Sequence, residues 1–139
     1  MVDDSCDDRF FLKELILKTT RFRIVGEVED GERAISYLRG DNEFGDRSKW
    51  PFPDLLLLDL TMPLKTGFEV LAWMRRLGQP IPTIILSGAC LPEDIARCRA
   101  LGAWGFVKKT PLHQALKEML PKIEEALEQG GSIFLLHEG

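Results

Sequence analysis

The sequence has no long apolar run. No stretch approaches the roughly 20 residues that a helix needs to cross a bilayer, although 45% of the 139 residues are hydrophobic. A secretory signal is also missing, because Asp3 and Asp4 stand where a basic and then apolar stretch would begin. We therefore expect one soluble, cytoplasmic domain without membrane contact, large enough to bury a core of its own.

Cysteine and clustered basic residues are scarce as well. The three cysteines form no CxxC pair and no Cys/His metal spacing, and their number is odd, so we expect reduced thiols and no disulfide framework. The formal net charge is -4, and Lys and Arg are scattered along the chain. Because binding to a phosphate backbone requires a basic face, we expect no nucleic acid partner for this segment.

What the sequence does contain is a set of short apolar runs. The segments 55–59 (LLLLD) and 83–87 (TIILS) lack alternation, which is typical of strands buried on both faces of a parallel sheet. A third run, 104–108, is shorter, and 22–28 (FRIVGEV) is less uniformly apolar, as expected of an edge strand. These four segments are the predicted strands.

Between the strands, apolar residues recur at helical spacing. The pattern predicts helices at 5–20, after a cap at Asp30, after a cap at Thr66, from Pro92 to Gly102, and from Leu112 to Leu127. Because proline inside a helix costs about 3 kcal/mol, we expect a kink or restart at Pro121. Strands that alternate with helices predict an α/β domain. The polar stretch 40–53 is predicted to be a long surface loop.

Polar side chains stand where the predicted strands end. In open α/β sheets the ligand lies outside the carboxyl ends of the strands, so we expect these side chains to share one pocket. Carboxylates that meet there raise one another's pKa unless a cation intervenes, and Mg²⁺ prefers such oxygen ligands. One carboxylate can then act as a nucleophile toward a phosphoryl group. The residues are Asp3, Asp4, Asp59, Ser87 and Lys109.

Four motifs in this order resemble the receiver domains of two-component response regulators. They are VDDS at 2–5, PDLLLLDLTMPLKTG at 53–67, IPTIILSGA at 81–89 and GAWGFVKK at 102–109. The resemblance extends from Val2 to about Leu127, and it implies a flavodoxin-like, doubly wound sheet of five parallel strands in the order 2-1-3-4-5 with helices on both faces. The segment 29–40 and the loop after it are similar to single-domain regulators that partner phytochrome kinases.

The resemblance also implies a role for each site residue. A sensor histidine kinase or phosphotransfer protein would donate a phosphoryl group, and a downstream protein or a homodimer would read the result. The domain itself would catalyse only its own phosphorylation and dephosphorylation. The implied roles are Asp59 as phosphoacceptor; Asp4, Asp59 and the backbone carbonyl of Thr61 as Mg²⁺ ligands, with Asp3 acting indirectly; Ser87 and Lys109 as phosphate contacts; and Phe106 as an aromatic switch.

Two other functions remain open. A magnesium-dependent phosphohydrolase with an aspartate nucleophile would commonly carry a second aspartate at the place of Thr61. A degenerate receiver, acting only as an interaction module, is favoured by Thr110, which stands where the family has proline after the lysine. The presence of all five phosphorylation residues argues against it. Phe106 could also have a purely structural role, because an aromatic residue in a short buried strand usually only packs in the core.

The central strand that the resemblance requires is nearly absent. Only Met1 and Val2 precede Asp3. An empty slot would leave two strand edges unpaired, so we hypothesise that residues 132–136 (SIFLL) occupy it, from this chain or from a neighbouring one. We accordingly predict a receiver domain at 1–129 and a tail at 130–139 that is either this strand or a segment outside the fold.

Overall fold

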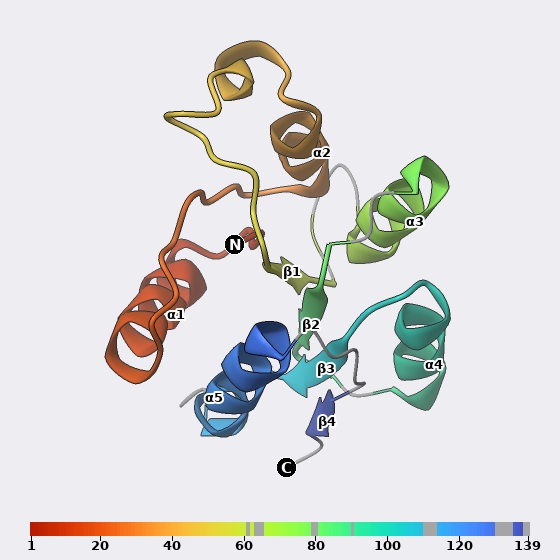
Figure 1. Ribbon diagram of the computed structural model, residues 1–139. Coiled ribbons are helices and arrows are strands. Elements are labelled where there is room, and N and C mark those ends of the chain that lie inside the picture. The colour runs from red at the N-terminus through yellow and green to blue at the C-terminus, as the bar shows by residue number, and fades with distance from the viewer. Residues whose placement is uncertain are drawn as a thin grey trace.

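The computed structural model describes residues 1–60, 62, 66–78, 81–89, 91–109, 114–129 and 135–137. Its strands form one parallel sheet in the order β1-β2-β3-β4, and helices surround this sheet (Figure 1). The predicted α/β class is therefore confirmed. In chain order the elements are α1 (Cys6–Thr19), α2 (Gly31–Arg39), the 3-10 helix η1 (Asn42–Gly45), β1 (Leu56–Asp59), α3 (Gly67–Leu77), β2 (Thr83–Ser87), α4 (Pro92–Ala100), β3 (Gly105–Lys108), α5 (Gln114–Glu128) and β4 (Leu135–His137).

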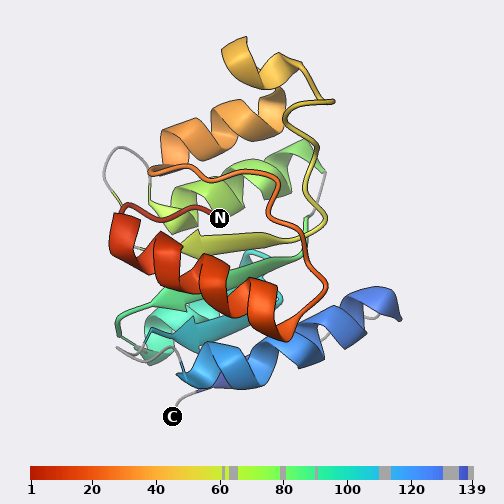
Figure 2. The same ribbon diagram turned by 90° about the vertical axis from the view of Figure 1, so that its left-hand side faces the viewer.

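Helices cover both faces of the sheet. Successive side chains of a strand point to opposite faces, and the sheet accordingly divides the core in two. Leu58 and Ile85 pack in the cluster that also contains residues of α2, α3 and α4. Leu57 and Ile84 pack in the cluster that contains residues of α1 and α5. Figure 2 shows α1 and α5 in front of the sheet on their common face.

The helix starts follow the capping residues of the sequence. The Asp30 carboxylate accepts a hydrogen bond from the Arg33 amide at 2.7 Å at the start of α2. Thr66 and Glu69 form a capping box at the start of α3. Both predicted caps are confirmed, because such bonds satisfy amide groups that have no partner inside the helix.

We expected a kink or a restart of the helix at Pro121. The helix does not restart there, since α5 continues through this residue. Pro121 lies on the exposed face of the helix. The opposite face packs Leu120 and Ile123 against the sheet, with 0% and 1% exposure. Burial of these side chains offsets the hydrogen bond that proline cannot donate.

Among the described residues, the central position of the sheet is held by Met1, Val2 and Asp3. Val2 forms isolated parallel bridges with Val28 on one side and Leu58 on the other. The Val2 amide donates to Leu57 O at 2.8 Å, and the Val28 amide donates to Met1 O at 3.0 Å. Within the described parts of the chain, the one bridge of the segment 22–28 is that of Val28 with Val2, so this segment forms no ladder. The five-stranded sheet of the prediction is replaced by four strands and this short central segment.

The C-terminal strand does not fill the central slot. β4 pairs in parallel with β3 at the other edge of the sheet, with Gly105 opposite Leu135. The hypothesis of a central position for residues 132–136 is thus wrong for this chain, and residues 132–134 themselves lie outside the described residues. The physical reason is the position of α5, which packs beside β3. The outer edge of β3 has unpaired backbone groups, and the chain that leaves the end of α5 can pair with them.

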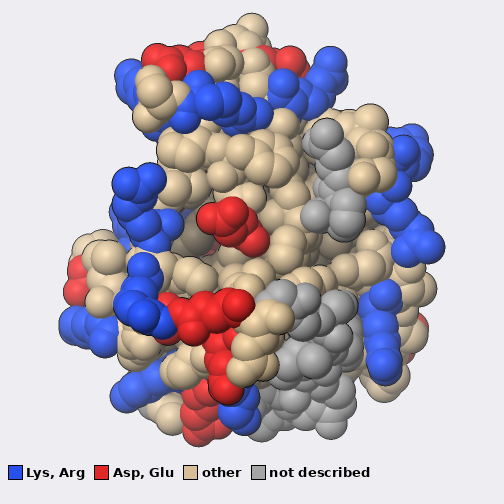
Figure 3. Space-filling model, in the orientation of Figure 1, with Lys and Arg blue, Asp and Glu red and all other residues tan. Residues whose placement is uncertain are grey.

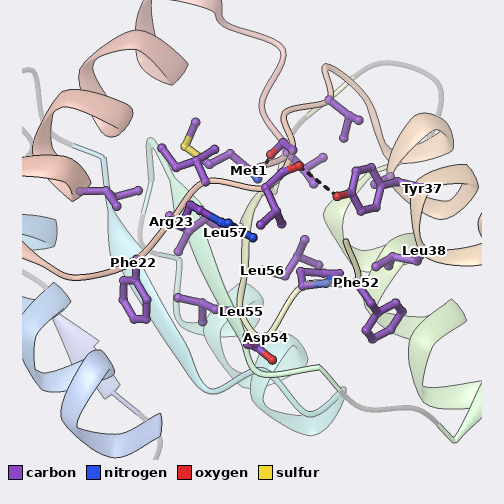
Figure 4. A pocket seen from close by; sticks show the side chains of 18 of the residues that line it. Met1, Phe22, Arg23, Tyr37, Leu38, Phe52, Asp54, Leu55, Leu56 and Leu57 are labelled. Carbon is purple, nitrogen blue, oxygen red and sulfur yellow. Dashed lines mark hydrogen bonds between the residues drawn. The ribbon is translucent and has the colours of Figure 1, made fainter. Parts of the chain in front are cut away.

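A cavity of about 310 Å³ lies where the central strand would continue ahead of Met1. Figure 4 shows the apolar side chains of Phe22, Leu55 and Leu56 around it. The Met1 amino group borders this cavity and donates to Gly26 O at 2.9 Å. Burial, which outweighs the opposing charge of Glu27, lowers the pKa of the Met1 amino group from 8.0 to about 6.

The sequence predicts no transmembrane helix and no disulfide framework, and both expectations can be examined in the described parts of the chain. No helix there combines the length and the apolar character needed to span a bilayer. Cys6 and Cys98 are free thiols, whereas Cys90 lies outside the described residues.

Four β-branched apolar residues added ahead of Met1 are expected to stabilise the protein. They would fill the cavity and pair the two flanking segments, for a net gain of about 1–3 kcal/mol after the cost of ordering the added chain. Urea denaturation measures this gain. An added Gly-Ser segment of the same length is the control, and equal midpoints for both extensions would contradict the assignment of the cavity as a strand slot.

Stability is also expected to depend on the Met1 amino group. Its folded pKa of about 6 lies below the ordinary value of 8.0, so the unfolded state binds more protons between pH 6 and pH 8. The free energy of unfolding should therefore rise by about 2–3 kcal/mol as pH increases through this window. Denaturation of the chain with and without an acetylated N-terminus checks this, because acetylation removes the charge. Identical pH slopes for the two forms would contradict the expectation.

Candidate functional site

The N-terminal acids and Asp59 meet at the carboxyl edge of the sheet. The Asp59 amide donates to Val2 O at 2.9 Å, which places Asp3 beside the end of β1. Asp3 and Asp59 are buried, with 1% and 6% exposure, whereas Asp4 is exposed. Ligand oxygens of Asp3, Asp4 and Asp59 all lie within 4.8 Å of one another. The strand ends thus bring these carboxylates together as the sequence predicts.

The Lys109 ammonium lies among these carboxylates. Its Nζ is 2.6 Å from Asp3 Oδ2 and 3.5 Å from Asp59 Oδ2. A third carboxylate, that of Asp8, lies at 2.9 Å and accepts a hydrogen bond from the ammonium. Burial lowers the pKa of Lys109, but the contacts with these three carboxylates outweigh burial and raise the pKa above its ordinary value.

The end of β3 determines which lysine enters the site. The Lys109 amide donates to Ser87 O at 2.6 Å, so Lys109 lies beside the end of β2. Lys108 stands one residue earlier, in the ladder opposite Ser87. Successive residues of a strand point to opposite faces, and it is the Lys109 side chain that reaches the acids.

The first turn of α1 is tied to Asp3. The Ser5 amide donates to Asp3 Oδ1 at 2.9 Å, and Arg9 Nη1 donates to Asp3 O at 2.6 Å. The Ser5 hydroxyl accepts from the Asp8 amide at 3.2 Å and caps the helix. Asp8 was not among the site residues predicted from the sequence. The signal that could have found it is its place in the first turn, where side chains lean toward the helix N-terminus and hence toward the site.

Ser87 and Phe106 each have partners outside the carboxylate cluster. The Ser87 hydroxyl donates to Ala89 O at 2.7 Å and accepts from the Ala89 amide at 3.2 Å. Phe106 is fully buried opposite Ile85 in the β2–β3 ladder. In this state Ser87 is therefore engaged within its own loop and Phe106 within the core. Thr61, expected to offer its carbonyl to the metal, lies outside the described residues.

Gly67 allows α3 to start against the end of β1. The Gly67 amide donates to Leu60 O at 3.0 Å. A Cβ atom at Gly67 would stand 2.6 Å from Asp59 O, a distance at which the backbone must shift. The glycine of the TMPLKTG motif therefore permits the close approach that holds the Asp59 backbone in place.

The charge distribution matches this geometry. Figure 3 shows acidic side chains gathered near the middle of one face, with many basic side chains toward its outline. Carboxylates are the ligands that hard divalent cations prefer. Apart from its ion pair with Lys109, Asp3 Oδ2 is buried without a hydrogen-bond partner among the described residues. The cluster of Asp3, Asp4 and Asp59 therefore fits a magnesium-like ion.

The family follows from comparison with known proteins. The family model of the response regulator receiver domain matches residues 1–121, and the chain belongs to this family. The two-component response regulator ARR17 of Arabidopsis thaliana is 36% identical over 112 residues, which cover 78% of this chain and 72% of that protein. ORR1 of Oryza sativa subsp. indica is 33% identical over 134 residues, or 93% of this chain and 55% of that protein. The chain thus spans little more than half the length of the rice relative.

Solved structures of similar proteins include regulators from phytochrome systems. The phosphorylated cyanobacterial phytochrome response regulator RcpA is 30% identical, with a TM-score of 0.78 and coverage of 94% of this chain and 92% of that one. The Mn²⁺-bound form of response regulator Rcp1 is 27% identical, with a TM-score of 0.69 and coverage of 90% and 87%. The bacteriophytochrome response regulator RtBRR is 25% identical, with a TM-score of 0.73 and coverage of 88% and 74%.

Replacement of Lys109 by methionine is expected to destabilise the metal-free protein by about 2–3 kcal/mol, because buried carboxylates lose their counter-ion. Magnesium should then stabilise Lys109→Met more than the wild type, since the ion no longer competes with an ammonium group. Thermal unfolding with and without magnesium measures both effects. Lys108→Met is the matched control, and an equal response to magnesium in wild type and Lys109→Met would contradict this account.

Proposed function

We propose that this receiver domain accepts a phosphoryl group on Asp59 from a phosphohistidine, with a bound divalent cation. The observation that carries the proposal is the carboxylate of Asp59 at the end of β1, with Asp3 and Asp4 within reach of the same ion and Lys109 at 3.5 Å. This set supplies a nucleophile, a metal site and a fixed positive charge in one place.

The metal ligands proposed are Asp4, Asp59 and the carbonyl of Thr61, with Asp3 acting indirectly. Magnesium bound there would supply positive charge to the oxygens of the incoming phosphoryl group and offset repulsion among the carboxylates. Asp3 is held by Ser5 and Arg9, so its carboxylate is oriented before any ion binds.

In the proposed transfer, an Asp59 carboxylate oxygen attacks phosphorus. The new O–P bond forms as the P–N bond to the donor histidine breaks, and the electron pair stays on the imidazole nitrogen, which takes up a proton. Lys109 contacts Asp59 before transfer and would contact a phosphoryl oxygen after it. The ammonium therefore offsets negative charge in both states without exchanging a proton.

The proposed switch begins at Ser87. Its hydroxyl now bonds Ala89, and on phosphorylation it would instead donate to a phosphoryl oxygen. The loop after β2 would then move toward the site. Phe106, which pairs with Ile85 in the neighbouring strand, would change its side-chain rotamer as this loop moves. The surface of α4, β3 and α5 would thereby gain a different affinity for a partner, as a two-state switch requires.

The donor we propose is a cytoplasmic sensor histidine kinase or a phosphotransfer protein. The likeness to RcpA and RtBRR, regulators named for phytochrome and bacteriophytochrome, favours a kinase of the phytochrome type. Output is proposed through a downstream protein or a homodimer. The net charge of -4 supports a protein rather than a nucleic acid as the target of this segment. Catalysis is confined to the domain's own phosphorylation and dephosphorylation.

Beryllofluoride, which imitates a phosphoryl group, tests the proposal. We expect it to bind only with magnesium and to shift NMR resonances around Asp59 and on α4, β3 and α5. Asp59→Asn should abolish binding, because the acceptor oxygen charge is lost. Asp54→Asn, an exposed aspartate ahead of the same strand, is the matched control and should bind normally.

Three other outcomes would contradict all or part of the proposal. Steady turnover of phosphate esters, dependent on Asp59, would indicate a phosphohydrolase. Absence of magnesium-dependent binding in the wild type would indicate a degenerate receiver. Binding that leaves α4, β3 and α5 unshifted would contradict the proposed switch but not the phosphoacceptor role.

A further inference from the structure

Lys109 is held by one carboxylate that the phosphorylation site does not use. Two of its three acidic contacts, Asp3 and Asp59, belong to the cluster that fits a metal ion. The third, Asp8 at 2.9 Å, belongs to α1 and lies outside that cluster. A divalent ion bound in that cluster would weaken the attraction of Asp3 and Asp59 for the ammonium group, whereas the contact with Asp8 would remain.

Asp8 is oriented independently of Lys109. Its backbone amide is bound by the Ser5 hydroxyl at the start of α1, and Ser5 is in turn bound to the Asp3 carboxylate. Arg9, the next residue, donates to Asp3 O and forms an ion pair with Glu27 at 3.5 Å. The first turn of α1 is therefore fixed to the site, and the Asp8 carboxylate is presented to Lys109 by a preorganised helix end.

We infer that Asp8 is a positioning residue, which holds the Lys109 ammonium at the edge of the pocket when a divalent ion occupies the cluster of Asp3, Asp4 and Asp59. Without Asp8, the acidic partners that the described residues offer to Lys109 are Asp3 and Asp59, which belong to the metal cluster. Binding of the ion then has to separate an ion pair. With Asp8 present, the ion and the ammonium occupy the pocket together. This inference rests on the proposed function.

Asp7 provides the comparison that isolates this role. Both aspartates lie in the first turn of α1, where a negative charge interacts favourably with the helix dipole. Asp7 is exposed, whereas the Asp8 side chain is 33% exposed and in contact with Lys109. A role in the helix dipole alone predicts the same effect for both residues. A role in positioning Lys109 predicts an effect for Asp8 only.

Manganese titration followed by electron paramagnetic resonance is the first test. We expect Asp8→Asn to raise the Kd for Mn²⁺ by about 10-fold, as for other residues that orient a metal site from outside its ligands. Asp7→Asn should raise it no more than about 2-fold, because an exposed charge is screened. Asp8→Glu should recover most of the affinity. Thermal unfolding of the metal-free variants checks that each one is folded.

The second test removes Lys109. In a Lys109→Met background, Asp8→Asn should change the Mn²⁺ affinity no more than Asp7→Asn does, because Asp8 acts through the lysine. In metal-free protein, the NMR signal of the Lys109 ammonium should be visible in the wild type and in Asp7→Asn. Faster exchange with water should weaken the signal in Asp8→Asn.

The outcomes separate the inference from the proposed function. If the wild type binds no Mn²⁺, the proposed phosphoacceptor site fails. If the wild type binds and Asp8→Asn matches Asp7→Asn, the metal site stands and the positioning role of Asp8 is refuted. An equally large effect of Asp8→Asn with and without Lys109 would also refute it, since Asp8 would then act on the ion directly.

Discussion

The contact between the Lys109 ammonium and the buried acids is the interaction on which this site depends. Asp3 and Asp59 are almost fully buried, and two such carboxylates cannot remain charged side by side without a nearby cation. Lys109 supplies that charge from the end of β3. The ammonium therefore lets the acids assemble without a metal ion, and it links three separate segments at one edge of the sheet.

The short central segment places Asp3 at the carboxyl edge through a single pair of bridges. Val2 has bridge partners on both sides, and the next residue, Asp3, reaches the carboxyl edge. The cavity ahead of Met1 lies on the opposite side of this segment from the acids. The cavity reduces the apolar surface buried in the core and so affects stability, whereas the acids at the carboxyl edge stay in place. In this fold the features that set stability are thus partly separate from those that form the site.

Several parts of the fold follow from residues that are neighbours in the chain. Asp30 and Thr66 cap helices as predicted, because a cap needs only amides three residues away. The buried strands ending at Asp59 and Ser87 were recognisable from their apolar runs. The segment 22–28 was misjudged, because a strand also requires a partner, and the strand at 135–137 was placed at the wrong edge. Pairing depends on which edges are free in three dimensions.

The sequence by itself determined the α/β class, most helix boundaries and the acids, hydroxyl and lysine expected at the carboxyl edge, since these depend on periodicity and on where strands end. Tertiary structure alone decided that Asp8 binds Lys109 across 101 positions of sequence, that Ser87 bonds its own loop, and that a cavity lies ahead of Met1. Such contacts arise when distant segments pack, and local propensity contains no information about which distant side chains will meet.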